Sequence, residues 1–139
     1  MTFGQAVSSG FANYANFNGR ASRSSYWYWV LFHFLVNIPF AIFFGTALGI
    51  AIASGATTAD RNIDPATIPL LAVASVLLGL VQLALFIPSI ALEVRRLHDI
   101  NFSGAWWWIQ LVPSVGSIIL FVFMLLPSVN EGNRYNQQS

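Results

Sequence analysis

Three long runs without a charged residue limit what this chain can fold into. They extend from Tyr26 to Ala53, from Ile68 to Leu92 and from Trp106 to Leu126. Each reaches the roughly 20 residues that a helix needs to cross about 30 Å of hydrocarbon. A helical hairpin in the last run would need about 40 residues, so one crossing fits it better than two. The runs predict an all-α membrane protein with three transmembrane helices, at about 26–53, 68–92 and 106–126, in a single membrane domain over residues 1–139.

Composition supports lipid as the solvent. Of the 139 residues, 56% are hydrophobic and 8% are charged, whereas soluble domains carry about 25% charged residues. The chain has no cysteine, which excludes disulfides, thiolate metal sites and cysteine nucleophiles. Its net charge of +1 is too small for a broad phosphate-binding surface. We therefore expect membrane lipids as partners, no nucleic acid and no cofactor.

A helical pattern precedes the first run, over about residues 3–15. Phe3, Val7, Phe11 and Tyr14 recur at helical spacing, with polar residues between them. This pattern is typical of a short amphipathic helix that lies in the membrane interface. A disordered tail with chance periodicity is the alternative.

Arginine positions set the expected orientation. Four arginines flank the ends of the first two runs that would share one side of the membrane, and two lie on the other side. By the positive-inside rule the N-terminus is cytoplasmic and the C-terminus external in a multi-pass protein with three spans. The four are Arg20, Arg23, Arg95 and Arg96, and the two are Arg61 and Arg134.

Tryptophans gather on the same expected side. Trp27, Trp106 and Trp107 lie where the first run starts and the third begins, close to these four arginines. Indoles favour the headgroup layer, and each arginine near an anionic surface contributes about 1 kcal/mol to binding. The pattern predicts contact with anionic lipid headgroups or a partner through Arg20, Arg23, Arg95, Arg96 and the tryptophans. Plain anchoring of the helices is the alternative interpretation.

The densest charge cluster is the segment E-V-R-R-L-H-D, from Glu93 to Asp99. Glu93 would pair with Arg96 one helical turn away, and Asp99 would neutralise Arg95 or Arg96. We interpret Glu93, His98 and Asp99 as a structural loop. A catalytic role for His98 and Asp99 would need a nucleophile, and a metal site would need a third ligand, at a defined spacing, and neither is present. The protein is expected not to be an enzyme and to hold no metal.

Four amide or imidazole side chains fall inside the runs, and each is costly in lipid unless it has a partner. Helical rise places Asn37 and Gln82 near the middle of the bilayer, where they could bond to each other. His33 and Gln110 lie nearer the cytoplasmic end. These residues could join helices by hydrogen bonds, or line a polar path for an ion or proton.

Small residues recur every fourth position on the first run, at Ala41, Gly45 and Gly49. The second run has Ser75 and Gly79 at the same spacing. Such stripes let helix backbones approach closely. They predict either packing of the first helix on the second or contact between copies in a homo-oligomer.

Three motifs resemble those of one family. They are F-N-G-R-A-S-R-S-S-Y-W at 17–27, R-R-L-H-D at 95–99 followed by S-G-A-W-W at 103–107, and N-R-Y at 133–135. In these the chain resembles the bacterial inner-membrane family labelled domain of unknown function 805. The resemblance implies a small multi-span protein of the bacterial cytoplasmic membrane. If the N-R-Y tail worked with the R-R-L-H-D segment, the third run would have to break at Pro113, and the length argument above favours an unbroken span.

The function expected from these features is that of a non-enzymatic scaffold or a module that contacts anionic lipid or a protein partner. The alternative is a small transporter or channel subunit, assembled as a homo-oligomer through the small-residue stripe. In that case His33, Asn37, Gln82 and Gln110 would line its path.

Overall fold

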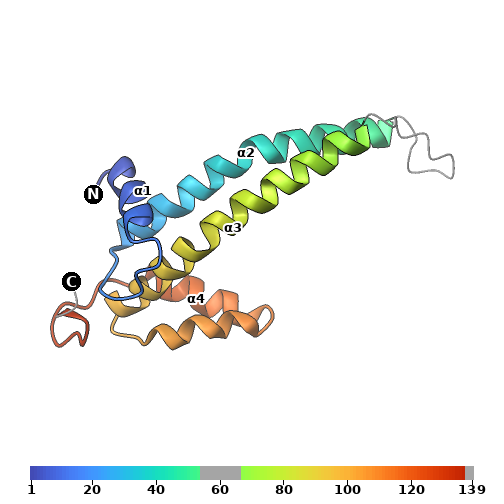
Figure 1. The fold of residues 1–139 in the computed structure, drawn as a ribbon. Helices are drawn as coiled ribbons and strands as arrows, with labels where there is room; N and C mark the ends of the chain where they lie inside the picture. The colour runs from blue at the N-terminus through green and yellow to red at the C-terminus, as the bar shows by residue number, and fades with distance from the viewer. Residues whose placement is uncertain (54–66, 137–139) are drawn as a thin grey trace. The chain divides into compact units, whose positions relative to one another are not determined.

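The structure is a computed structural model that describes residues 1–53 and 67–136, and every regular element in this part of the chain is a helix (Figure 1). The elements are α1 (Phe3–Ala12), α2 (Arg23–Ala53), α3 (Thr67–Asp99), the 3₁₀ helix η1 (Gly104–Leu111) and α4 (Val115–Leu125). The all-α prediction is confirmed. The chain forms two compact units, Met1–Phe32 with Leu85–Ser139 and His33–Ala84, and α2 and α3 contribute to both. The prediction of a single domain stays a prediction, and Arg61 of the orientation count lies outside the described residues.

Within the described residues, two helices are long and apolar enough to cross a membrane, judged by length and composition. They are Arg23–Ile50 and Ile68–Asp99, which contain the first two apolar runs. Their most apolar windows are 0% and 6% buried, unlike the core helix of a soluble protein. Pro39 and Pro88 lie inside α2 and α3 without ending either helix.

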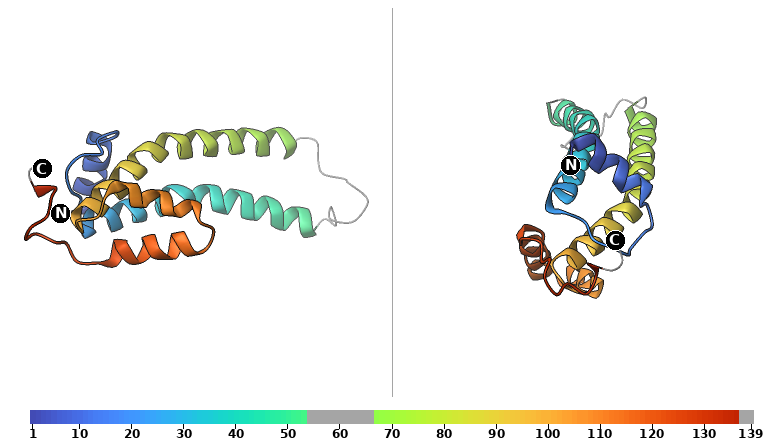
Figure 2. Two further views of the ribbon diagram at one scale, coloured as in Figure 1. Left: turned by 90° about the horizontal axis from the view of Figure 1, so that it is seen from below. Right: turned by 90° about the vertical axis from the view of Figure 1, so that its left-hand side faces the viewer.

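In the unit His33–Ala84, the two long helices run side by side (Figure 2). Gln82 Nε2 donates to Asn37 Oδ1 at 2.8 Å, and Asn37 Nδ2 donates to the carbonyl of His33 at 2.8 Å. The bond expected between Asn37 and Gln82 is therefore confirmed. This hydrogen bond between the two amide side chains links α2 to α3.

The small-residue stripe does not pack within this unit. A Cβ added at Gly45, Gly49 or Gly79 would meet no atom within 4 Å. Ala41 and Ser75 are also exposed, and the Ser75 hydroxyl bonds to the carbonyl of Leu71 in its own helix. The prediction that the first helix packs on the second through these glycines is wrong. Contact between copies stays a prediction.

Helix α1 is shorter than the predicted 3–15 and begins with a capping box. Thr2 Oγ1 accepts from the Gln5 amide at 3.3 Å, and Gln5 Oε1 accepts from the Thr2 amide at 2.8 Å. This exchange satisfies two donors that a helix start leaves free. Ala6 and Gly10 are buried, and a Cβ at Gly10 would overlap the ring of Trp29 on α2. A location of α1 in the membrane interface stays a prediction.

The single helix predicted over 106–126 is wrong. The third run forms two short helices, η1 and α4, which pack on each other as a hairpin (Figure 2). Val112 is extended, as residues before a proline prefer, and Ser114 has a positive φ of 65°. The close approach at Gly116 then fixes the turn, because a Cβ there would overlap the carbonyl of Ile109. Two helices of spanning length and this hairpin are therefore found where three single helices were predicted.

Candidate functional site

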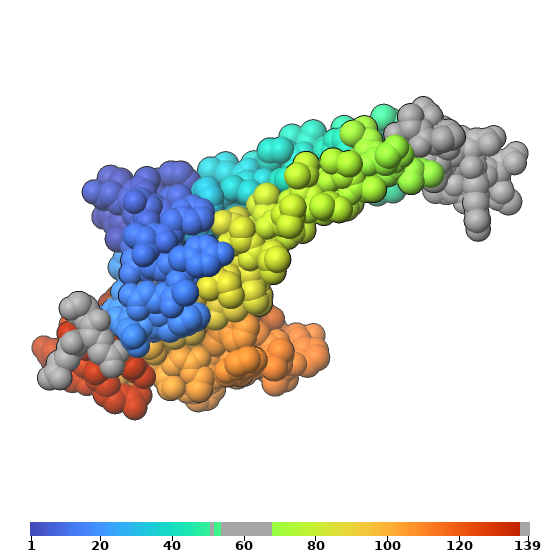
Figure 3. Space-filling model, in the orientation of Figure 1, coloured from blue at the N-terminus to red at the C-terminus, as the bar shows by residue number. Residues whose placement is uncertain are grey.

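Three segments distant in sequence meet at the end of α3. They are the loop 17–21, the last turn of α3 and the tail 126–136. Figure 3 shows the red tail beside the blue N-terminal segment, and Arg20 Nη1 bonds to the side chain of Asn136 across this contact. We call the group formed by Arg20, Arg96, Asp99, Ser128 and Asn133 the Asp99 cluster.

The Asp99 carboxylate is the centre of this cluster. Its Oδ1 accepts from Arg20 Nε at 3.0 Å and from Arg20 Nη2 at 2.7 Å. Its Oδ2 accepts from Arg96 Nη1 and from the Ser128 hydroxyl. Arg96 is completely buried and Asp99 is 4% exposed. Water therefore screens these charges weakly, and each arginine depends on the carboxylate for its countercharge.

The tail also bonds to the backbone at the end of α3. Asn133 Nδ2 donates to the carbonyls of His98 and Asp99, at 2.9 and 3.2 Å. The Val129 amide donates to the Asp99 carbonyl at 2.9 Å, and Arg96 Nη2 donates to the carbonyl of Leu126. The last carbonyls of a helix lack partners inside the helix. The tail supplies partners for α3 and is fixed to it in return.

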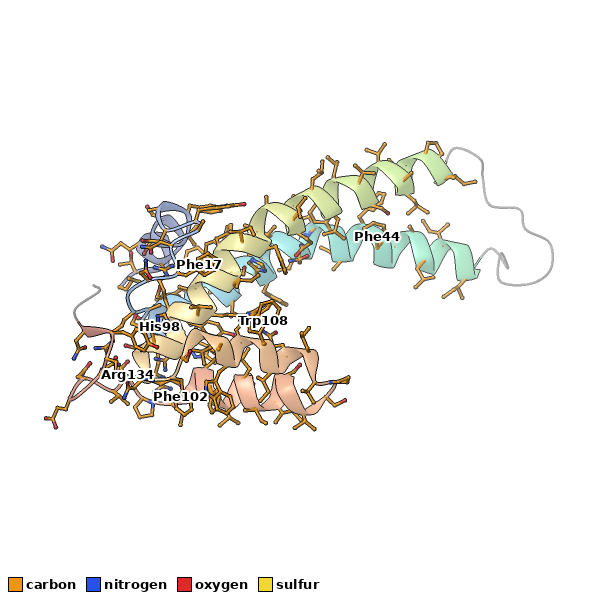
Figure 4. The ribbon with its side chains drawn as sticks, turned by 60° about the horizontal axis from the view of Figure 1, so that its bottom comes forward. Phe17, Phe44, His98, Phe102, Trp108 and Arg134 are labelled. Carbon is orange, nitrogen blue, oxygen red and sulfur yellow. The ribbon has the colours of Figure 1, made fainter. Side chains whose placement is uncertain are left out.

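His98 is held from two sides. Its Nδ1 donates to the carbonyl of Gly19 at 3.1 Å, and its ring stacks on Tyr135 with centroids 3.8 Å apart and planes at 9°. Arg134 next to Tyr135 bonds to both the side chain and the carbonyl of Asn101. Figure 4 labels His98 and Arg134 at this end of α3. His98 and Asp99 thus both contact the loop 17–21 and the tail, through different residues of each segment.

Glu93 makes a second polar contact and ties η1 to α3. Its Oε2 accepts from Trp107 Nε1 at 2.6 Å and from Gln110 Nε2 at 3.2 Å. The predicted pair between Glu93 and Arg96 is wrong, because Arg96 binds Asp99 instead. The expected neutralisation of Arg96 by Asp99 is confirmed. Gln110 therefore contacts the end of α3.

The predicted lipid-contacting row of arginines is wrong for Arg95 and Arg96. These side chains are 5% and 0% exposed, which removes them from headgroups. The Arg95 Nε donates to the carbonyl of Ala91 at 3.3 Å, and its Nη2 is buried without a hydrogen-bond partner in the described part of the chain. Arg20 is bound by Asp99, so Arg23 is the exposed member of the four.

The tryptophans also take different positions. Trp27 is half-buried and its ring contacts Phe121 of α4 with centroids 6.0 Å apart. Trp107 is half-buried on Glu93, while Trp106 is exposed. Trp106 and Trp107 thus belong to the hairpin itself, and Trp27 packs against it.

The sequence prediction set aside contact between the N-R-Y tail and R-R-L-H-D on grounds of length, and it did not foresee the partners in the loop before α2. Asn130 accepts from Arg20 Nη2 at 2.8 Å, and Ser128, Asn133 and Asn136 bond to the same cluster. The signal was present in the N-R-Y and F-N-G-R motifs. Both motifs contain residues that bond to the last turn of α3 or to its partners. The residues that identify the family are therefore also residues that hold this part of the structure together.

These features define an all-helical membrane protein. Two helices have spanning length, and a buried arginine–aspartate cluster holds a shorter apolar hairpin and the chain's tail. Within the described residues, no three His, Asp or Glu side chains gather in a way that could hold a metal ion.

Comparison with known proteins confirms the resemblance seen in the sequence. The chain belongs to the family described as "Protein of unknown function (DUF805)", whose model matches residues 14–137. It is 32% identical over 123 residues to the inner membrane protein YhaI of Escherichia coli (strain K12), covering 88% of this chain and 85% of YhaI. It is 30% identical over 126 residues to the inner membrane protein YhaH of the same strain, covering 88% and 86%. No solved structure matches.

Proposed function

We propose that this protein is a non-enzymatic, lipid-contacting scaffold of the bacterial inner membrane. The observation that carries the proposal is the division between the polar residues of the family motifs, which bond within the protein, and the exposed apolar residues of the hairpin. Their polar side chains bond to the carboxylate or to the backbone of Asp99, whereas the hairpin formed by η1 and α4 exposes apolar side chains. A surface of that kind is stable against lipid and unfavourable in water. The contact function therefore belongs to the hairpin and the long helices.

The hairpin's dimensions suit one leaflet of the bilayer. Helix α4 has 11 residues, which span about 16 Å, or roughly half of the 30 Å hydrocarbon core. Both ends of the hairpin are tied to the end of α3, through Glu93 at η1 and Arg96 at Leu126. The exposed apolar side chains are those of Trp106, Trp108, Leu111, Val112, Val115, Ile118, Phe121, Val122 and Leu125. A hairpin of this length enters the bilayer and returns to the side it came from.

This topology places the C-terminal tail on the same side as the N-terminus. Five of the six arginines, all except Arg61, then lie on one side, which favours the cytoplasm by the positive-inside rule. The earlier prediction of an external C-terminus is replaced by a cytoplasmic one in this proposal. The two long helices make the protein multi-pass.

Cysteine labelling tests this topology, and the wild-type chain is its own blank because it has no cysteine. Glu131→Cys marks the tail, and Asp60→Cys marks the linker between the two long helices. With a membrane-impermeant maleimide on intact cells, we expect labelling at residue 60 and none at residue 131 until the membrane is opened. Labelling of residue 131 on intact cells would refute the returning hairpin and restore three full spans.

Anionic headgroup contact is the finer part of the proposal and rests on Arg23. This side chain is exposed, and one arginine near an anionic surface contributes about 1 kcal/mol. We expect Arg23→Gln to lower the ratio of anionic to zwitterionic phospholipid retained in native mass spectrometry. An unchanged ratio would limit the protein to hydrocarbon contact without headgroup preference.

A homo-oligomeric transporter or channel subunit is the second candidate. The observation that favours it is the open space above Gly45, Gly49 and Gly79, where a helix of another copy could pack. A continuous polar path is disfavoured because the side chains of Asn37 and Gln82 hydrogen-bond to each other. Native mass spectrometry in nanodiscs separates the two candidates, because a strictly monomeric particle would exclude a path built from several copies.

A further inference from the structure

An apolar cleft of about 450 Å³ lies beside the hairpin, within the unit that holds the Asp99 cluster. Phe86, Ile90 and Val94, spaced every four residues, form its wall on α3. Trp107 and Trp108 face them from η1. Its volume falls within the roughly 300–1,000 Å³ of typical ligand sites.

The walls offer an occupant hydrocarbon contact and little else. Their side chains are aliphatic or aromatic, and the N–H of Trp107 is already donated to Glu93 at 2.6 Å. A ligand with buried polar groups would leave those groups without partners, which is costly. The cleft therefore favours a plain apolar chain.

The two ends of the cleft differ. At one end Phe17 and Gly104 contribute to the wall, and a Cβ on Gly104 would lie 2.7 Å from Val94 Cγ1, so α3 and η1 approach closely there. This end is next to His98, whose Nε2 lies 3.4 Å from the same position. Toward the other end, Phe86 is 52% exposed on α3. Figure 4 labels Phe17 and Trp108 of this wall.

The direction of the cleft is that of a lipid tail. The wall from Phe86 to Val94 covers about 12 Å along α3 at the helical rise. Helix α3 is one of the two helices of spanning length, and Phe86 belongs to it. If α3 crosses the bilayer, the cleft runs along the acyl chains from the charged end of α3 toward the hydrocarbon, and its mouth is continuous with the lipid-facing surface.

We propose that this cleft binds one acyl chain of a membrane phospholipid. The inference rests on the proposed function, because it requires that this face of the protein meets lipid. It goes further in naming a defined site, at which a chain remains bound when the surrounding lipid is removed.

The test uses the full-length protein and two matched variants. Ile90→Trp fills the cleft from α3, and Glu131→Trp adds the same indole at an exposed position of the tail, away from the cleft wall and the hairpin. Each protein is purified in detergent, delipidated and studied by native mass spectrometry for retained phospholipid. A phosphatidylethanolamine carrying a diazirine in one acyl chain is then photolysed with it, and the labelled peptides are mapped.

We expect the wild type and Glu131→Trp to retain a phospholipid and to be labelled on the peptides of the cleft wall. Ile90→Trp should lower retention about tenfold, the change expected when about two methylene groups lose their burial. Equal retention by Ile90→Trp and Glu131→Trp overturns the site. A dimer that Ile90→Trp abolishes also overturns it, because a second copy would then be the occupant.

The same labelling separates this site from the proposed function. Labels on α4 without labels on the cleft wall would refute the acyl-chain site and leave the lipid-contacting hairpin standing. Absence of labels from both α4 and the cleft would refute the two together.

Discussion

Replacing Asp99 by asparagine tests whether the Asp99 cluster holds the tail and hairpin on α3. The amide keeps the shape of the carboxylate and removes its charge. Arg96, whose side chain is 0% exposed, then loses its countercharge, and so does Arg20 at 15% exposed. Breaking a buried pair by removing one partner costs about 3–5 kcal/mol, so we expect a loss of this size in the free energy of unfolding of Asp99→Asn.

Arg20→Gln should destabilise the protein less than Asp99→Asn does. It leaves Arg96 paired with Asp99 and removes charge-assisted bonds from a partly exposed group, worth about 1.5–3 kcal/mol. Glu131→Gln is the blank, because Glu131 is exposed and such substitutions stay within about 0.5 kcal/mol. Exchanging Arg96 for methionine in the Asp99→Asn background should recover part of the loss, since the stranded buried cation is gone.

Reversible unfolding in mixed detergent micelles measures these free energies, and limited trypsin digestion reports the tail directly. Arg134 lies in the tail and bonds to Asn101, so we expect cleavage after Arg134 to accelerate in Asp99→Asn and to stay slow in Glu131→Gln. A cost below about 1 kcal/mol for Asp99→Asn, far under the range for a broken buried pair, with an unchanged rate of cleavage, would refute the cluster as the fastening of the tail.

Three other substitutions test separate contacts by the same unfolding measurement. Gly116→Ala should lower the free energy of unfolding by about 1–3 kcal/mol, because its Cβ meets the backbone of Ile109. Gly45→Ala, in open space, should be neutral or stabilising by up to about 1 kcal/mol. Equal changes in stability for the two variants would contradict the tight turn at Gly116. Gln82→Leu should cost about 0.6 kcal/mol, the mean for a hydrogen bond between membrane helices, and a loss above about 2 kcal/mol would mean that the amide does more than join two helices. Glu93→Leu should cost about 1–3 kcal/mol by leaving two donors unpaired, with Glu93→Gln closer to wild type; if both cost the same, the hydrogen bonds are not what ties η1 to α3.

The long helices were predictable because length and the absence of charge are sufficient to identify them. The same counting along the helical rise brought Asn37 and Gln82 to one depth, and their side chains do bond. The family could also be identified, since its motifs are contiguous in sequence. Helix length, depth along a helix and contiguous motifs depend on residues close in sequence or on the regular helical rise, so they can be read from the sequence.

The break in the third run was not predictable by length. The prediction assumed that each leg of a hairpin must cross the whole bilayer, whereas η1 has 8 residues and α4 has 11. What breaks the run is a combination of small effects around Pro113, above all the positive φ of Ser114 and the space left by Gly116. Pro39 and Pro88 show that a proline alone does not have this effect.

The partner of Arg20 was also not predictable from the sequence. Arg20 and Asp99 are 79 residues apart in the chain, and nothing local indicates that they meet. Charge counting treats an arginine near a helix end as solvent-facing, although Arg96 is buried. The tail adds further partners, the carbonyl of Leu126 for Arg96 and the side chain of Asn130 for Arg20, and its position depends on the break in the third run.

The position of the Asp99 cluster in the chain has a consequence for biosynthesis. Asp99 and Arg96 leave the ribosome before Ser128 and Asn133, which complete their set of partners. Domains fold as their residues emerge during synthesis, and contacts of large sequence separation form late. The two long helices are available for insertion while the cluster is still open, so Ser128 and Asn133 complete the cluster only after both helices have been made.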